Sequence, residues 1–221
     1  ECIQDRCLVT LARGHNPAGI AVDATSVYFT NCAETGTVMK IPVGGGPITV
    51  LAEAQNCPSG IALDDENVYW VNHWGRTVMK CDKRGCGGKP TVLAEDQWSP
   101  SRIAVDATDV YWTNHGSYAE ATGSVMRCSK NGCDGAPTTL ASNQSVAFGI
   151  ALDAISVYWT TEWGGTVMKC SKKGCAGSAT ILASNQPDPH DIVVAGGSVF
   201  WTNDNGRFHQ GTVSSCAITG C

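Results

Sequence analysis

The sequence predicts an all-β fold, a five-bladed β-propeller of four-stranded antiparallel blades, and three observations lead to this prediction. A four-residue phrase of the type Tyr-Trp-Thr-Asn recurs five times, beginning at positions 28, 69, 111, 158 and 200. These positions are 41, 42, 47 and 42 residues apart, and one four-stranded propeller blade needs roughly 40–45 residues. No stretch of the 221 residues has the periodicity of an amphipathic helix.

Each repeat contains four short runs in the same order. The first is an apolar run such as Gly-Ile-Ala-Val-Asp at 19–23, and a tight polar turn separates it from the Tyr-Trp run. A loop of variable length leads to a Thr-Val-Met-Lys run, and a turn rich in Gly and Pro leads to a Thr-Val-Leu-Ala run. Runs of β-branched and aromatic residues bounded by Gly, Pro, Asn and Asp are typical of strands. We therefore expect four strands per blade, named A to D.

Three sets of repeated residues are expected to be structural. The B-strand tryptophans should stack between blades, and the aspartates that end the A strands should bond to the backbone of the A–B turn, as Asp does in turns. The lysines of the C–D turns, such as Lys83 and Lys172, are expected to keep the sheet edges soluble and to be replaceable without effect on folding. The tryptophans are Trp70, Trp112, Trp159 and Trp201, and the aspartates are Asp23, Asp64, Asp106 and Asp153.

We expect the N-terminal strand to close the ring. Residues 8–12, Leu-Val-Thr-Leu-Ala, match a D strand that has no A, B or C strand before it, and the last repeat ends after its C strand. The two fragments would complete one blade, and closure would remove the exposed edges of an open array. The predicted organisation is one domain over residues 1–221, with blades at 13–52, 53–94, 95–141, 142–183 and 184–216 plus 8–12.

The repeats resemble the YWTD family, the class B repeats of low-density-lipoprotein-receptor-type proteins. The resemblance rests on Pro-x-Gly-Ile-Ala-Val-Asp, then Tyr-Trp-Thr-Asn, then Gly-Thr-Val-Met, and it covers nearly the whole chain. Two features depart from the family: the fourth motif position is Asn or Thr instead of Asp, and family members usually have six blades. The resemblance implies a β-propeller that binds extracellular partners, here as a bacterial-type secreted variant with five repeats.

The cysteines predict disulfides and an oxidising compartment. Twelve cysteines in a chain with no cofactor motif are typical of secreted proteins. Ten of them form Cys-x4-Cys units, and a hairpin end brings two Cα atoms close enough for a disulfide; zinc is the alternative, but each pair falls on a separate blade. We expect the bridges Cys81–Cys86, Cys128–Cys133 and Cys170–Cys175, and a bridge between blades from Cys32 to Cys57. Cys2, Cys7, Cys216 and Cys221 pair either locally or across the termini. The predicted location is secreted, either extracellular or periplasmic.

The B–C and D–A loops open on one face of a propeller, called the top face here, and this face carries the unusual residues. Binding residues concentrate on loops held by a rigid scaffold. The top loops have nine acidic residues against four arginines, which disfavours nucleic acid as a ligand. The candidate ligand-binding residues are His73, Trp74, Trp98, Arg102, His115, Tyr118, Phe148, Glu162, Trp163, His190, Asp191, Asp204, Phe208 and His209.

Three functions fit these residues. The leading hypothesis is a secreted, non-enzymatic recognition module that binds carbohydrate or a glycosylated surface, since Trp74, Trp98 and Trp163 could stack on sugar rings. The first alternative is a protein-binding scaffold, as the YWTD resemblance implies. The second alternative is a metal-binding or catalytic propeller, because the residues that follow the B-strand phrases can all ligate metals: Cys32, His73, His115, Glu162 and Asp204. No hydrolase, zinc-protease or phosphate-loop motif occurs, so we assign no catalytic residue, metal or cofactor, and we expect no membrane insertion.

Overall fold

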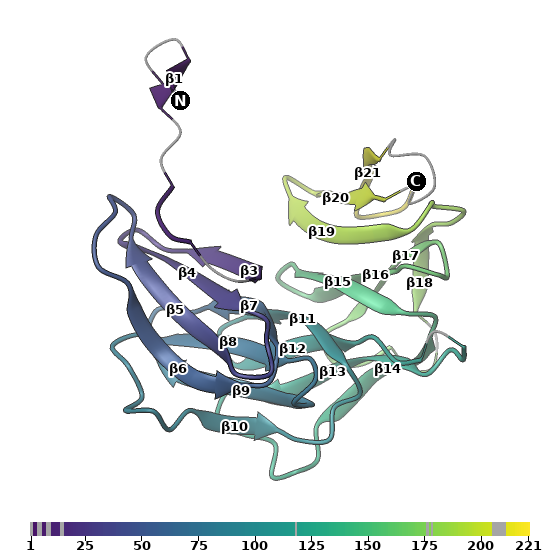
Figure 1. Ribbon diagram of the computed structural model, residues 1–221. Helices are drawn as coiled ribbons and strands as arrows, with labels where there is room; N and C mark the ends of the chain where they lie inside the picture. Colours follow the sequence, from purple (N-terminus) through teal and green to yellow (C-terminus); the bar gives the residue numbers. More distant parts are fainter. Residues whose placement is uncertain are drawn as a thin grey trace.

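The computed structural model describes residues 2–3, 6–7, 10–13, 16–117, 119–175, 177, 179–204 and 211–221. It consists of antiparallel sheets arranged side by side around a common centre (Figure 1). We call five of them blades 1 to 5, and a short N-terminal hairpin precedes them. Within the described residues there is no helix, and so none that could cross a membrane.

The strands follow the A-to-D order that the repeats predict. The hairpin pairs β1 (Cys2–Ile3) with β2 (Arg6–Cys7). Blade 1 is β3 (Pro17–Val22), β4 (Ser26–Asn31), β5 (Gly36–Pro42) and β6 (Thr49–Gln55); blade 2 is β7 (Pro58–Leu63), β8 (Asn67–Asn72), β9 (Thr77–Asp82) and β10 (Thr91–Ala94); blade 3 is β11 (Pro100–Val105), β12 (Asp109–Asn114), β13 (Gly123–Ser129) and β14 (Thr138–Gln144); blade 4 is β15 (Ala147–Leu152), β16 (Ser156–Thr161), β17 (Thr166–Ser171) and β18 (Thr180–Ala183); blade 5 is β19 (Pro189–Ala195), β20 (Ser198–Asn203) and β21 (Thr212–Ala217). The A strands pack on one another in sequence, which places β3, β7, β11, β15 and β19 at the centre.

The predicted closure of the ring is not formed. Blade 5 has three strands in the described part of the chain, and residues 10–13 belong to no strand. Leu11 and Ala12 instead pack on blade 1, beside Phe29 and Ile41. Blades 1 and 5 consequently face each other across an opening (Figure 1).

Apolar side chains of consecutive blades interlock, as the repeats predict. Tyr28 and Val38 of blade 1 form one buried cluster with Trp70 and Met79 of blade 2. The same combination of a tyrosine from one blade and a tryptophan from the next recurs at the following three junctions. All four B-strand tryptophans are buried, which confirms their role in the core. Flat rings bury a large area at such a junction and contribute strongly to stability.

A glutamine that ends or follows each D strand fixes the tryptophan of the next blade. Gln55 Oε1 accepts hydrogen bonds from Trp70 Nε1 (3.1 Å) and from Asn72 Nδ2 (2.9 Å). The bond recurs 15 residues apart in three further pairs, Gln97–Trp112, Gln144–Trp159 and Gln186–Trp201. It satisfies the buried indole N–H and ties the D–A loop to the B strand.

In blades 1 to 3, the aspartate that follows the A strand joins two blades on the bottom face. Asp64 accepts hydrogen bonds from the backbone N–H groups of Glu66 and Asn67, which confirms the predicted turn bonds. It also accepts a bond from the Tyr69 hydroxyl at 2.8 Å and pairs with Lys130 of the next blade at 2.8 Å.

The lysines of the C–D turns are therefore not merely solubilising, and this expectation was wrong. Lys83 pairs with Asp23 at 2.8 Å, and Lys172 pairs with Asp106 at 2.9 Å. Both lysine side chains are largely buried against the preceding blade. The sequence conceals these pairs because the partners are about 60 residues apart.

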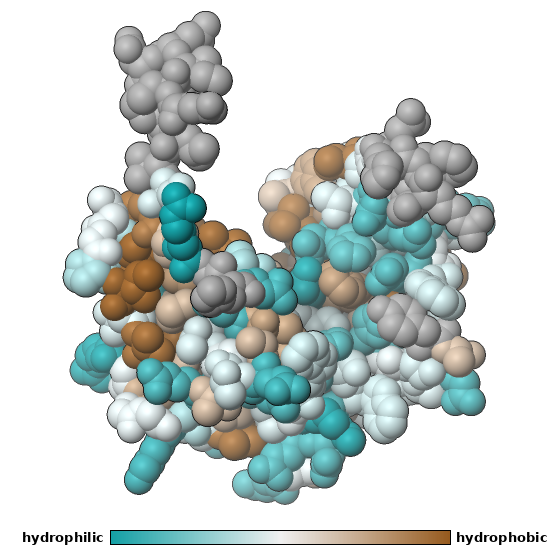
Figure 2. All heavy atoms as spheres, viewed as in Figure 1, coloured by the Kyte–Doolittle hydropathy of each residue, from teal (hydrophilic) through white to brown (hydrophobic). Residues whose placement is uncertain are grey.

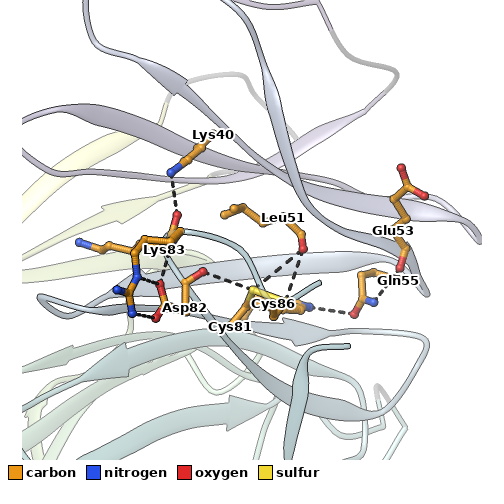
Figure 3. The surroundings of a disulfide bond; sticks show 10 residues. Lys40, Leu51, Glu53, Gln55, Cys81, Asp82, Lys83 and Cys86 are labelled. Atoms are coloured by element: carbon orange, nitrogen blue, oxygen red, sulfur yellow. Dashed lines mark hydrogen bonds and ion pairs between the residues drawn. A yellow bond between two sulfur atoms is a disulfide. The ribbon is translucent and has the colours of Figure 1, made fainter. Parts of the chain in front are cut away.

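The disulfides agree with the cysteine pattern. Cys32–Cys57 links blade 1 to blade 2, and Cys81–Cys86, Cys128–Cys133 and Cys170–Cys175 close C–D turns. At the C-terminal pair the open question resolves toward local pairing, because Cys216 bonds to Cys221. The backbone register of β1 and β2 places Cys2 opposite Cys7. The sulfurs of Cys81 and Cys86 lie 3.9 and 3.5 Å from the Leu51 carbonyl oxygen, so this bridge packs against the outer strand of blade 1 (Figure 3).

Lys172→Ala should lower the free energy of unfolding by about 1–3 kcal/mol, because it leaves the Asp106 carboxylate without its charged partner. Lys173→Ala is the matched control, since Lys173 is the neighbouring lysine and is exposed. Urea unfolding of both variants checks this prediction. Equal midpoints for the two variants would show that the ion pair contributes nothing.

Acid should weaken the blade junctions. Burial raises the pKa of Asp106, but the hydrogen bond and charge of Lys172 and the bonds from the backbone N–H groups of Asp109 and Thr108 outweigh it and hold this pKa well below its ordinary range. Because the folded-state pKa is depressed, the stabilisation is complete above the unfolded pKa of about 4 and is lost as the pH falls below it. As the pH is lowered from about 5 to about 2, the melting temperature of Asp106→Asn should fall less steeply than that of the parent protein. The exposed Asp65→Asn should keep the parent's slope.

Candidate ligand-binding face

The residues that follow the B strands come together on the top face in three neighbouring blades. His73 follows β8, His115 follows β12 and Glu162 follows β16. The backbone N–H of each donates to a carbonyl just before the A strand of its own blade, at 2.9, 3.0 and 2.9 Å. These bonds hold the three side chains at equivalent positions around the centre.

Residues near the beginning of three A strands complete this group. Arg102 lies in β11, Phe148 in β15, and His190 and Asp191 in β19. The Arg102 guanidinium carbon lies 4.3 Å above the Phe148 ring, and the rings of Phe148 and His190 are 4.0 Å apart. Arg102 Nε donates to Asp191 Oδ1 at 2.8 Å, which links blade 3 to blade 5. We call the seven residues the axial cluster: His73, Arg102, His115, Phe148, Glu162, His190 and Asp191.

Glu162 lies between two imidazoles of the axial cluster. Nε2 of His115 and Nε2 of His190 are each 4.0 Å from Glu162 Oε2. His115 is buried, and its Nδ1 lies 3.3 Å from the Gly116 carbonyl oxygen. The arrangement offers a carboxylate acceptor and ring nitrogens to a polar ligand. In the described ranges, no three His, Cys, Asp or Glu side chains are grouped so as to hold a metal ion.

The environment of His73 favours the neutral form of its ring. Burial lowers its pKa, and the nearby His115 acts in the same direction, while the bond from Nδ1 to the Pro100 carbonyl at 3.2 Å partly opposes them. The two imidazole rings are 6.4 Å apart and nearly perpendicular.

Three tryptophans of the top loops project into solvent, unlike the B-strand tryptophans. Trp74, Trp98 and Trp163 are 54, 57 and 59% exposed. Trp74 and Trp163 occupy equivalent B–C loop positions in blades 2 and 4, whereas Trp98 lies in the D–A loop before blade 3. The Arg76 guanidinium lies 5.1 Å from the Trp98 ring centroid and 3.8 Å from Asp96.

The remaining predicted residues do not join these groups. Asp204 is exposed, and its backbone N–H donates to the Asp188 carbonyl at 3.0 Å. Cys32, the equivalent residue of blade 1, is bonded to Cys57 in a disulfide. Tyr118, Phe208 and His209 lie outside the described residues.

Sequence reasoning placed Arg76 on the top face but not among the candidate ligand-binding residues, and it missed the glutamines. The side-chain oxygen of Gln97 accepts a hydrogen bond from the Trp112 indole, and its backbone carbonyl accepts one from Arg76 Nε at 3.4 Å. The signal was present, because a glutamine precedes each B-strand tryptophan by 15 residues.

Comparisons with known proteins support a β-propeller. No family model and no curated protein matches the chain. Among solved structures, a chain of a nidogen/laminin complex is 19% identical with a TM-score of 0.75, covering 92% of this chain and 76% of that one. The calcium-binding protein regucalcin from Agrobacterium tumefaciens is 15% identical with a TM-score of 0.70, covering 96% and 74%. Virginiamycin B lyase from Staphylococcus aureus is 15% identical with a TM-score of 0.63, covering 92% and 70%. All three are six-bladed propellers, so the similarity identifies the fold without identifying a function.

The lowered pKa of His73 leads to a titration test. Its ring should remain neutral as the pH falls through about 6.5, the ordinary value for histidine. Because the pKa of His73 is lower in the folded state than in the unfolded state, protons bind the unfolded chain more readily below about pH 6.5. The free energy of unfolding should therefore be highest above that pH and decrease as the pH falls below it. NMR titration of the imidazole signals checks this, with His73→Gln identifying the resonance. A midpoint at or above the value measured in denatured protein would contradict the expected effect of burial.

Proposed function

We propose that the chain is a secreted, non-enzymatic recognition module that binds carbohydrate or a glycosylated surface through its top-face loops. The observation that carries the proposal is the exposure of Trp74, Trp98 and Trp163 on one face. An indole ring left in water forgoes the stabilisation of burial, and the blades bury their other tryptophans completely or nearly so. Three large rings exposed on one face favour a binding role.

Backbone hydrogen bonds fix the loops that carry these rings. Beside Trp74, the Gly75 N–H donates to the Asn56 carbonyl at 3.0 Å, and beside Trp163, the Gly164 N–H donates to the Ser145 carbonyl at 3.3 Å. The Trp98 carbonyl accepts a bond from the Gly116 N–H at 3.4 Å. A preorganised ring loses little conformational entropy on binding, which favours affinity.

Sugars match the chemistry of this face. Their C–H faces stack on indole rings, and their hydroxyls need both donors and acceptors. The axial cluster supplies both kinds: Glu162 and Asp191 carry acceptors, while Arg102 and His190 carry N–H groups. Trp74 and Trp163 lie in two blades that are not neighbours, and Trp98 lies in a different type of loop. This distribution favours a few unequal sugar-binding subsites over five identical ones.

A protein ligand is the second candidate. The observation that favours it is the likeness of the fold to a chain of a nidogen/laminin complex. Tryptophan and arginine are enriched among the residues that dominate protein interfaces, and Arg76 stacked on Trp98 fits that role. The same rings would then anchor one broad contact.

A glycan array probed with the purified chain separates the two candidates. Binding to defined glycans that free sugar competes away supports the carbohydrate proposal. For any glycoprotein that binds, the measurement is repeated after enzymatic removal of its glycans. Binding that survives deglycosylation, together with a blank array, would replace carbohydrate with a protein surface as the ligand.

Trp74→Ala, Trp98→Ala and Trp163→Ala should each weaken binding of an array hit by about 1–2 kcal/mol, roughly 5- to 30-fold. Their melting temperatures should change little, because the side chains are exposed. Isothermal titration calorimetry with the array hit checks the affinities. Trp112→Ala should do the opposite and cost about 3–5 kcal/mol of stability, since that ring is fully buried. Unchanged affinity in all three top-face variants would reject these rings as the ligand contacts.

A further inference from the structure

The axial cluster contains two carboxylates, and among the described residues only one of them is paired with an arginine or lysine. Asp191 Oδ1 accepts a hydrogen bond from Arg102 Nε at 2.8 Å. Glu162 Oε2 has Nε2 of His115 and Nε2 of His190 at 4.0 Å each, which is beyond hydrogen-bond distance. No other group in the described part of the chain donates to the Glu162 carboxylate. Because its side chain is only 19% exposed, the charge is poorly solvated, and a donor brought by a ligand would stabilise it.

The tautomer of His115 places a second acceptor beside this carboxylate. His115 Nδ1 lies 3.3 Å from the Gly116 carbonyl oxygen, which can only accept a hydrogen bond, so Nδ1 carries the proton of the neutral ring and Nε2 is an acceptor. Two acceptors that lie 4.0 Å apart favour a donor between them. A nitrogen atom in hydrogen-bond contact with both would bond them at an angle of about 90°, within reach of two N–H groups of one ammonium.

His190 brings a third ring nitrogen to the same oxygen atom. Its Nε2 is also 4.0 Å from Glu162 Oε2, and its ring packs on Phe148 with 4.0 Å between the ring centroids. An ammonium has three N–H donors and no acceptor, so one such group could reach the carboxylate and both imidazole rings. The described residues do not provide the grouping that a metal ion needs. An organic ammonium is therefore the cation that fits this arrangement.

The charge of the top face favours a cationic ligand as well. Its loops contain nine acidic residues and four arginines, and two of these arginines are already engaged: Arg76 with Asp96 at 3.8 Å and Arg102 with Asp191 at 2.8 Å. A surface with an excess of one charge raises the local concentration of ligands of the opposite charge. Hydrophilic and weakly polar residues cover most of blades 2 to 4 in the view of Figure 2, whereas strongly apolar surface lies mainly over blade 1. Away from blade 1, the visible surface therefore suits a polar ligand.

We propose that the axial cluster binds the ammonium group of an amino sugar, with Glu162 Oε2 as the charged partner and Nε2 of His115 and of His190 as further acceptors. This inference rests on the proposed carbohydrate-binding function and names the class of sugar. Trp163 directly follows Glu162, so the B–C loop of blade 4 carries both a ring for stacking and the carboxylate. An N-acetylated sugar would lose the contact, because acetylation removes the charge and two of the three N–H groups.

Isothermal titration calorimetry with matched sugars tests the ammonium contact. The probes are hexamers of glucosamine and of galactosamine, each with free amines and fully N-acetylated, titrated at pH 7 in EDTA so that no metal bridges the contact. At least one free-amine hexamer should bind about 10-fold more tightly than its acetylated form. Glu162→Gln should remove most of this preference by lowering the affinity for the free amine about 10-fold, while the affinity for the acetylated form changes less than about twofold.

Glu95→Gln is the matched control. Glu95 is an exposed acid of the top face in the D–A loop before blade 3, so this change removes the same charge away from the axial cluster. It should leave the preference for the free amine unchanged. An equal loss of preference in both variants would show that only the overall charge of the face matters, which would overturn the site. Melting temperatures show whether each variant folds, and if Glu162→Gln does not, the comparison of the two sugar forms with the parent protein decides.

The remaining outcomes separate this inference from the proposed function on which it rests. Equal affinity for both sugar forms, weakened by Trp163→Ala, would overturn the ammonium contact and leave carbohydrate binding intact. Hexalysine bound as tightly as the amino sugar, with the same dependence on Glu162, would assign the contact to a lysine of a protein partner and overturn the amino sugar. If no hexamer binds, the inference fails, and the glycan array alone decides the proposed function.

Discussion

The bond from a tryptophan indole to a glutamine of the preceding loop is the interaction on which the rest of this structure depends. A buried indole is favourable between blades only if its N–H finds an acceptor. Gln55 and its three equivalents supply that acceptor, and each glutamine amide donates to the carbonyl two residues earlier in the chain. This bond therefore has two effects. It satisfies the N–H group of the buried tryptophan, and it fixes the D–A loop, which forms part of the top face. Trp98 directly follows such a glutamine.

Stability in this molecule is distributed over junctions, as in other repeat folds where each unit contacts its neighbours. The junctions are not equal. At the fourth, Ile218 stands where Lys83, Lys130 and Lys172 stand at the first three, so Asp153 keeps its turn and tyrosine bonds without a lysine. Blade 5 is held to blade 4 by an apolar cluster and by bonds from Lys169 to the Ile218 carbonyl and from Thr160 to the His190 carbonyl, both at 2.6 Å. The bond from Arg102 to Asp191 adds a polar contact across the centre.

Local pattern was sufficient to predict most of the fold. Strand order, the buried tryptophans, the aspartate turns and the disulfides all follow from short motifs whose physical role does not depend on distant residues. The failures share a cause. The pairing of Lys172 with Asp106 and the meeting of Arg102 with Asp191 depend on how blades are placed in space, and no periodicity of one repeat encodes that. The same limit applies to residues 10–12: their composition indicates a D strand, but composition does not determine whether β21 is within reach. For the site, position after the B strand selected five residues, of which His73, His115 and Glu162 gather at the centre and Cys32 and Asp204 do not. The sequence pattern could not decide between them, and the exposure of Trp74 and Trp163 likewise required coordinates.

The bridge from Cys32 to Cys57 has a consequence for how the molecule would come apart. Blade 1 has Phe29 where the other blades have tryptophan, and it has no disulfide in its C–D turn, so it lacks two of the features that secure its neighbours. The covalent link to blade 2 compensates for both. Reduction would open this link together with the turn bridges of the other blades, but only here would it cut a covalent connection between two blades. Blade 1 would then be held to blade 2 by its apolar cluster and by the contacts of Lys83, which forms the only side-chain ion pair described at this junction.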